Sequence, residues 1–467
     1  MAWTINNGKL YFNTTLYTGN GSTQSITGVG FQPDFVWGKE RSSTSSHFLV
    51  DVVRGNTKGL QSDLTNVEFT SSNYITSFDS DGFGIGNSGQ INENSQTYAS
   101  WNWLAAGTAP SNTYAVKVVS DSGNKYRFDD FGTSAVTLEI SEGGTFTFDQ
   151  SDSSNNGHPL RFATQADAAN SSQYTTGVTT NGTPGQAGAY TRITVAASAP
   201  TLFYYCTNHT GMGGQANTPT TNSFSSFDGS IQSNISPNTT SGFSIVSWTG
   251  SGADATVGHG LNSAPTIYIV KNRTDASDWR VGQVLTSSNN MTDGNGYYME
   301  LNDTKASTNP GSAVTWGSTP TAPTSSVFTV GSNNSHNGSS DAMIAYCFHS
   351  VNGYSKMGSY TGNGNADGTF VYTGFKPAWV MVKQTNASGE DWFICDTKRE
   401  GYNAENNRLM PNLSSAESTD SPIDILSNGF KARLSGANVN ASGGTYIFMA
   451  FAENPFTSSA GTPVTAR

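Results

Sequence analysis

Tyr17-Thr-Gly-Asn-Gly21 is a short stretch that recurs twice along the chain, and this recurrence decides the predicted fold. The pattern returns as Trp248-Thr-Gly-Ser-Gly252 and as Tyr360-Thr-Gly-Asn-Gly364. An aromatic residue followed by two closely spaced glycines is typical of a β-strand that ends in a turn. Three such stretches predict three modules that share one architecture.

Two further signatures follow each of these turns in the same order. The first is a strand entered from a glycine turn: Gly30-Phe-Gln-Pro-Asp-Phe-Val-Trp-Gly-Lys39, Gly260-Leu-Asn-Ser-Ala-Pro-Thr-Ile-Tyr-Ile-Val-Lys271 and Gly374-Phe-Lys-Pro-Ala-Trp-Val-Met-Val-Lys383. The second closes each copy: Thr97-Tyr-Ala-Ser-Trp-Asn-Trp103, Ala342-Met-Ile-Ala-Tyr-Cys-Phe348 and Thr445-Tyr-Ile-Phe-Met-Ala-Phe451. Large and small side chains tend to alternate in these closing strands, as in half-buried β-strands. Each copy spans roughly 100 residues, which predicts an antiparallel β-sandwich such as a jelly roll.

Composition supports a folded, all-β chain and excludes several kinds of partner. Of the 467 residues, 12% are charged and 11% are aromatic, and the net charge is −11. Aromatic and β-branched residues are too plentiful for a disordered chain, and the sequence has no cluster of Lys and Arg that would bind nucleic acid. No run approaches the roughly 20 apolar residues of a membrane span, and residues 1–7 lack the pattern of a signal peptide. The three cysteines, an odd number, do not form a disulfide framework.

A segment of different character separates the first two copies. Its predicted strands are Tyr114–Val119, Tyr126–Phe128, Val136–Ile140, Thr145–Phe148 and Tyr190–Val195. This content predicts a Greek-key sandwich. The predicted organisation is therefore module 1 (residues 1–107), an inserted domain (108–219), module 2 (220–353) and module 3 (354–467).

The inserted domain resembles the cupredoxins. Residues 202–214 contain Cys206-Thr-Asn-His209-Thr-Gly-Met212, which is similar to the compact Cys-x-x-His-x-x-Met ligand loop of amicyanin-type proteins, and His158 follows a strand where that family carries its first histidine ligand. The resemblance implies a type-1 copper site of His158, Cys206, His209 and Met212, because a thiolate, two imidazoles and a weak axial thioether suit copper. The alternative is that Cys206 and Met212 only fill the core. Pro159 directly after the histidine and the long polar run 165–188 depart from the family pattern.

The repeats resemble a family of virion proteins. Gly353-Tyr-Ser-Lys-Met-Gly-Ser-Tyr-Thr-Gly-Asn-Gly364 and Gly443-Gly-Thr-Tyr-Ile-Phe-Met-Ala-Phe-Ala-Glu-Asn-Pro-Phe456 are similar to repeats of phage tail and other virion proteins, especially marine ones. This resemblance implies lectin-like sandwiches and a virion location, outside the host after lysis. It implies no defined ligand. With no catalytic set in the sequence, we expect a non-enzymatic tail fibre or appendage subunit that contacts other virion proteins as a homo-oligomer, such as a trimer, with a host-surface glycan as a candidate partner.

Two alternative functions remain open at this stage. A carbohydrate-binding module array would use exposed aromatics, but the tryptophans lie on alternating strands and most are predicted to be core. A copper redox protein with sandwich appendages is the other. The sequence shows no catalytic set, although the acids of a glycosidase need not be close in sequence. His47, His259, His336 and His349 have no ligand spacing and are predicted to be surface or loop residues.

Overall fold

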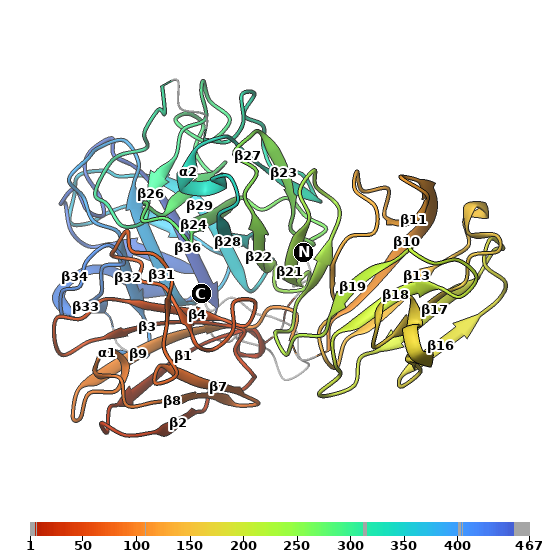
Figure 1. Cartoon of the computed structure of the whole chain (residues 1–467). Helices are drawn as coiled ribbons and strands as arrows, with labels where there is room; N and C mark the ends of the chain where they lie inside the picture. Colours follow the sequence, from red (N-terminus) through yellow and green to blue (C-terminus); the bar gives the residue numbers. More distant parts are fainter. Residues whose placement is uncertain are drawn as a thin grey trace, which may run out of the picture.

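The computed structural model describes residues 5, 7–107, 109–311, 315–399, 403 and 405–452 (Figure 1). Residues 453–456 of the virion-type motif lie outside this range. The described chain is built almost wholly from β-strands, and its two α-helices have four residues each, so the predicted all-β sandwich class is confirmed. None of the helices in the described ranges is long and apolar enough to cross a membrane.

Each module has its elements in the order that the sequence signatures predict. Module 1 contains η1 (Gly8–Leu10), β1 (Phe12–Thr18), β2 (Gln24–Thr27), β3 (Phe35–Glu40), β4 (Phe48–Asp51), β5 (Lys58–Gly59), β6 (Phe69–Thr70), β7 (Ile75–Asp79), β8 (Gly82–Ile85), α1 (Gly89–Asn92) and β9 (Thr97–Trp103). Module 2 contains β20 (Phe224–Ser226), β21 (Ser233–Asn238), β22 (Phe243–Thr249), β23 (Ala255–Gly258), β24 (Ile267–Asn272), β25 (Arg280–Gln283), β26 (Met299–Glu300), β27 (Val327–Val330), α2 (Asn334–Asn337) and β28 (Ala342–Phe348). Module 3 contains β29 (Ser355–Thr361), β30 (Phe370–Tyr372), β31 (Pro377–Gln384), β32 (Phe393–Asp396), β33 (Glu405–Arg408), β34 (Ser418–Leu426), β35 (Gly429–Ala432) and β36 (Thr445–Ala452).

The larger sheet has one strand order in all three modules. The orders are β1-β9-β3-β4, β22-β28-β24-β25 and β29-β36-β31-β32, so the closing strand always lies between the first strand and the proline-led strand. The second sheet pairs β2 with β8, β23 with β27 and β30 with β35 at corresponding places. Module 2 alone extends its larger sheet, with β20 and β21 at one edge and β26 at the other.

A buried asparagine explains the repeated glycine turn. The side-chain oxygens of Asn92, Asn337 and Asn440 accept hydrogen bonds from the backbone of Asn20, Ser251 and Asn363, at 2.9, 3.1 and 3.0 Å. The second glycine of each turn has a positive φ of 65–69°, which glycine adopts without strain. The glycines are recognisable in the sequence, but the asparagine is not, because it lies more than 70 residues away along the chain.

The three modules form a closed ring within one chain. Three backbone hydrogen bonds at corresponding positions join them, and they run from Glu68 N to Arg273 O (2.9 Å), from Ser307 N to Thr385 O (2.7 Å) and from Glu417 N to Arg41 O (2.9 Å). Module 1 thus contacts module 2, module 2 contacts module 3, and module 3 contacts module 1. This arrangement approximates threefold symmetry, which the sequence alone did not demonstrate.

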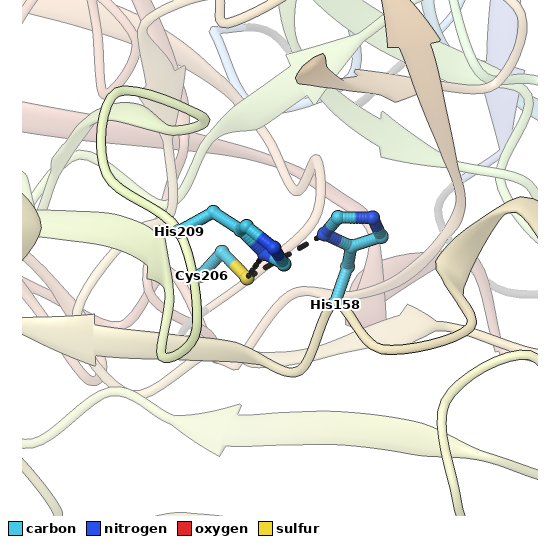
Figure 2. Close-up of side chains that lie close together, drawn as sticks. All are labelled: His158, Cys206 and His209. Carbon is cyan, nitrogen blue, oxygen red and sulfur yellow. Dashed lines mark hydrogen bonds between the residues drawn. The ribbon is translucent and has the colours of Figure 1, made fainter.

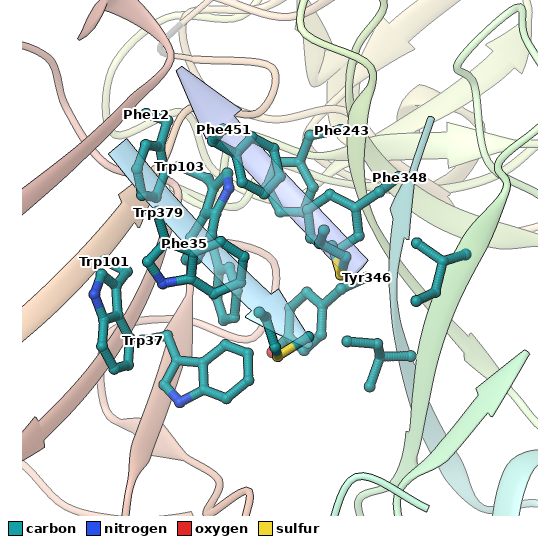
Figure 3. Close-up of a cluster of buried hydrophobic side chains, with 14 of the residues drawn as sticks. Phe12, Phe35, Trp37, Trp101, Trp103, Phe243, Tyr346, Phe348, Trp379 and Phe451 are labelled. Atoms are coloured by element: carbon teal, nitrogen blue, oxygen red, sulfur yellow. The ribbon is translucent and has the colours of Figure 1, made fainter. Parts of the chain in front are cut away.

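The centre of the ring is one aromatic core to which every module contributes (Figure 3). Phe35 of module 1 stacks on Tyr346 of module 2 with ring centroids 4.2 Å apart, and Phe12 stacks on Phe451 of module 3 at 5.2 Å. Trp37, Trp101, Trp103, Trp248, Trp279, Trp316, Trp379 and Trp392 are all buried. Six of them line the shared core, whereas Trp248 and Trp316 lie in the core that module 2 shares with the inserted domain. None of the eight is available to stack on sugars.

The inserted domain is a two-sheet sandwich beside the ring, on the right in Figure 1. It contains β10 (Ser111–Ser120), β11 (Asn124–Phe128), β12 (Leu138–Glu139), β13 (Thr145–Asp149), η2 (Ser153–Asn155), β14 (Leu160–Ala163), η3 (Ala166–Ser171), β15 (Gln173–Tyr174), β16 (Val178–Asn181), β17 (Tyr190–Thr194), β18 (Leu202–Cys206) and β19 (Gly214–Asn217). Its sheets have the orders β11-β10-β13-β17-β16 and β12-β19-β18-β14-β15, and the pairs β10–β13 and β12–β19 are parallel. Phe227 of module 2 packs against Tyr114 and Phe128 of this domain, so the two cores are continuous.

Candidate metal centre

Two neighbouring strands bring the predicted ligands to one end of the inserted domain. Cys206 is the last residue of β18, and it lies directly opposite Leu160 at the start of β14. His158 precedes Leu160 by two residues, whereas His209 lies in the turn that follows β18. A cysteine and a histidine about 50 positions apart in sequence therefore become neighbours because their strands pair in this register.

The two imidazoles point their Nδ1 atoms at the cysteine sulfur (Figure 2). Cys206 Sγ lies 3.8 Å from His158 Nδ1 and 3.6 Å from His209 Nδ1. In the described ranges this is the only group of three or more His, Cys, Asp or Glu side chains close enough to hold one metal ion, and its ligand atoms lie within 4.8 Å of one another.

These distances fit a metal ion bound by all three residues. Metal–sulfur bonds of about 2.3 Å and metal–nitrogen bonds of about 2.0 Å, at angles between tetrahedral and trigonal, place sulfur about 3.5–3.7 Å from each nitrogen. The observed separations of 3.6 and 3.8 Å are close to that range. Met212, the fourth predicted ligand, is buried on the same loop, with 1% of its surface exposed.

Hydrogen bonds hold the two ligand loops in place. The carbonyl oxygen of His158 accepts hydrogen bonds from the Tyr126 hydroxyl and from the Gln150 side chain, both at 2.9 Å. Asn208, between the cysteine and the second histidine, donates to Gly157 O at 2.8 Å and so ties one loop to the other. Because these supports come from the surrounding strands and loops, the ligand positions are set by the fold without a bound ion.

The environment favours the metal-binding forms of the ligands. Burial, followed by the neighbouring His209, lowers the pKa of His158, so its imidazole is neutral and can donate a lone pair at neutral pH. Burial, and to a smaller extent the neighbouring Cys206, raises the pKa of Tyr126. The Tyr126 hydroxyl therefore keeps its proton and remains a hydrogen-bond donor. Cys206 is 4% exposed, whereas His209 is exposed, so the site is shielded on one side and open at its second histidine.

The other four histidines are predicted from the sequence to be surface or loop residues: His47, His259 and His349 lie outside the strands and helices, whereas His336 lies in α2, and three of the four are not at the surface. His47, His259 and His336 are fully buried, and His349 is half-buried. His47 directly precedes β4, at the position that Trp279 and Trp392 occupy in the other modules. A ring nitrogen of each residue forms a 2.9 Å hydrogen bond with a backbone carbonyl oxygen of the neighbouring module. The partners are Met410 O for His47, Gln61 O for Trp279 and Glu300 O for Trp392. His47 therefore serves ring closure, and the matching position in the repeats was the signal that could have shown it.

Comparisons with known proteins place the chain in a family without giving it a function. A family model described as a domain of unknown function (DUF7483) matches residues 7–129 and 151–455. No curated protein and no solved structure matches the chain. The match covers the three modules together with His158, Cys206, His209 and Met212 of the inserted domain. The chain therefore belongs to the DUF7483 family, and the inserted domain is part of what the family model describes.

Proposed function

We propose that the protein binds a copper ion through His158, Cys206, His209 and Met212. The observation that carries this proposal is the convergence of two imidazole Nδ1 atoms on one thiol sulfur, 3.8 and 3.6 Å away. A site with one thiolate, two imidazoles and a thioether matches the preference of copper, whereas structural zinc sites favour four strong ligands. A loaded site would supply one-electron transfer, since copper alternates between two oxidation states.

The chain's own residues would tune such a site in two ways. The buried position of Cys206 excludes water from the thiolate, and the hydrogen bonds to Gly157 O and His158 O limit how far the ligand loops can move. The exposed His209 would offer a route between the site and a redox partner. Electron transfer is therefore the activity that this proposal implies.

Titration of the full chain with Cu(II) tests the proposal. We expect a strong blue thiolate-to-copper absorption band that reaches its full intensity at one equivalent. Cys206→Ser should abolish the band because a serine hydroxyl is neither soft nor ionised. Cys347→Ala is the matched control: Cys347 is also buried and free, but it lies in module 2 and should leave the band unchanged. No band in the native protein, or a band that survives Cys206→Ser, would refute copper binding.

We further propose that the three-module ring is a non-enzymatic structural body of a virion, such as part of a tail fibre or appendage. Two observations support this second function. The repeat motifs resemble those of phage virion proteins, and the modules are fused through a shared aromatic core into one body. A body of this kind is suited to bear load and to present the inserted domain on one side.

Proteomic analysis of purified virions tests the structural proposal. In particles of a phage that encodes this chain, we expect the intact protein at a fixed copy number that persists after high-salt washing and nuclease treatment. Complete absence of the protein from washed particles would contradict a virion location, whatever the outcome of the copper titration.

A further inference from the structure

Module 3 displays two aromatic rings to solvent on a single edge strand. Phe370 and Tyr372 of β30 have exposed fractions of 44% and 61%, whereas Val371 between them is buried at 5%. Alternate residues of a strand face the same side of a sheet, so both rings share the outer face, about 7 Å apart along the strand. Among the residues that the structure describes, most other aromatic side chains of the modules are buried in the cores.

The sister modules show that the fold does not need these aromatics. Val371 pairs with Phe430, Ile26 pairs with Phe83, and Val257 pairs with Phe328, which aligns the three edge strands. The positions that correspond to Phe370 and Tyr372 hold the exposed Ser25 and Thr27 in module 1, and Thr256 and the buried Gly258 in module 2. Because two modules form the same strand pair with small or polar residues, the rings of module 3 require another explanation.

Both rings lie beside glycines, and much of each ring remains exposed to solvent. A Cβ atom added to Gly429 would lie 3.1 Å from Phe370 Cε2, and one added to Gly374 would lie 3.6 Å from the Tyr372 hydroxyl. Gly82 takes the place of Gly429 in module 1 without an aromatic cover, so shielding a glycine does not account for the rings.

Paired charges border the rings on the same face. Lys431 lies directly opposite Phe370 and forms an ion pair with Asp367, and Asp424 lies opposite Lys431 and pairs with Arg433 at 3.3 Å. Two acids and two bases give this border no net charge. It offers hydrogen-bond donors and acceptors beside an apolar platform.

We propose that this face, formed by Phe370, Tyr372, Lys431 and Asp424, binds a neutral glycan. The C–H groups on one face of a pyranose ring carry partial positive charge, and they stack on the electron-rich face of an aromatic ring. The hydroxyl groups at the rim of the sugar would then meet the bordering carboxylates, ammonium and guanidinium. The absence of net charge in this border favours a neutral glycan over an acidic one, and the inference stands independently of copper binding.

Affinity electrophoresis of the full chain through native gels tests this site. The gels contain a soluble neutral glucan, mannan, galactan or xylan, with acidic alginate for comparison. We expect at least one neutral polysaccharide to retard the protein. Phe370→Ser/Tyr372→Thr, which gives module 3 residue types found at these positions in module 1, should weaken that binding at least about tenfold. Leu10→Ser/Val67→Thr, which removes exposed apolar residues elsewhere, is the matched control and should bind as the native protein does.

Several results would overturn the glycan proposal. The proposal fails if no neutral polysaccharide retards the protein or if alginate alone does. It also fails if the native protein and the Phe370→Ser/Tyr372→Thr variant are retarded equally. Self-association that this variant abolishes, seen by sedimentation velocity, would show instead that the face binds a second copy. Cys206→Ser should keep the retardation, so failure of the copper site and failure of the glycan site are separable. Circular dichroism of each variant shows whether it is folded.

Discussion

Gly362 illustrates at the residue scale why the repeated turn needs its first glycine. A Cβ atom at this position would lie 2.2 Å from the carbonyl oxygen of Ala441, and the corresponding atoms at Gly19 and Gly250 would lie 2.1 Å from carbonyl oxygens of their own modules. The turn therefore packs directly against the segment that carries the buried asparagine. Any side chain would push the two segments apart and break the hydrogen bond between Asn363 N and Asn440.

Gly362→Ala should consequently destabilise the protein. We expect a loss of about 1–3 kcal/mol in the free energy of unfolding, measured by urea denaturation, because the neighbouring atom is backbone and cannot move aside. Gly436→Ala in the same module is the control, since nothing lies within 4 Å of a Cβ at that glycine. Equal stability of the two variants would show that the close approach is not a constraint.

At the scale of elements, the segments that join neighbouring strands carry the charged contacts of the ring. Glu68 of module 1 accepts hydrogen bonds from Arg273 of module 2 at 2.8 and 2.9 Å and from Arg54 at 3.2 Å. Glu417 of module 3 makes the corresponding contacts with Arg41 of module 1 and with Arg399. The interface between modules 2 and 3 has Ser307 and Thr385 at these positions, which are joined by a backbone hydrogen bond in place of an ion pair.

Glu68→Gln should weaken the first of these interfaces in a pH-dependent way. Burial alone would raise the pKa of Glu68, but the hydrogen bonds from Arg273 and the charge of Arg54 lower this pKa below its usual value of 4.5. The carboxylate thus adds stability that is fully present above pH 4.5 and is lost as the pH falls through the lower pKa of the folded state. Thermal denaturation should show a loss of about 1–3 kcal/mol at pH 7 and a smaller loss at pH 3.

Glu93→Gln serves as the control for this experiment because Glu93 is exposed. Its effect on the free energy of unfolding should stay within about 0.5 kcal/mol. A Glu68→Gln effect that is equally small, or that does not change with pH, would contradict an ionic role for Glu68.

For the whole molecule, the shared core makes the three modules interdependent. Phe35 contacts Trp103 of its own module and Tyr346 and Phe243 of module 2, with ring centroids between 4.2 and 6.0 Å apart. The closing strands of all three modules line the same core, so no module could be removed without exposing a large aromatic surface. We therefore expect the ring to unfold as one cooperative unit.

Phe35→Ala tests this cooperativity. We expect a loss of about 3–5 kcal/mol and faster amide hydrogen exchange in β22 and β28 of module 2 as well as in module 1. Phe83→Ala is the control: Phe83 is equally buried, but it belongs to a separate core inside module 1, so its effect on exchange should be greatest there. Faster exchange confined to module 1 in the Phe35→Ala variant would show that the modules unfold independently.

The sequence by itself determined the all-β class, the order of signatures in each module and the candidate ligands of the inserted domain. These features could be predicted because alternation, glycine turns and the Cys-x-x-His-x-x-Met spacing are local patterns, set by neighbours along the chain. Tertiary structure decided the closure of the ring, the burial of His47 and the outward position of Phe370 and Tyr372. The contacts responsible join residues that are far apart in sequence, such as Glu68 and Arg273, which lie 205 positions apart. Such contacts depend on how complete sheets pack, and no local pattern records that packing.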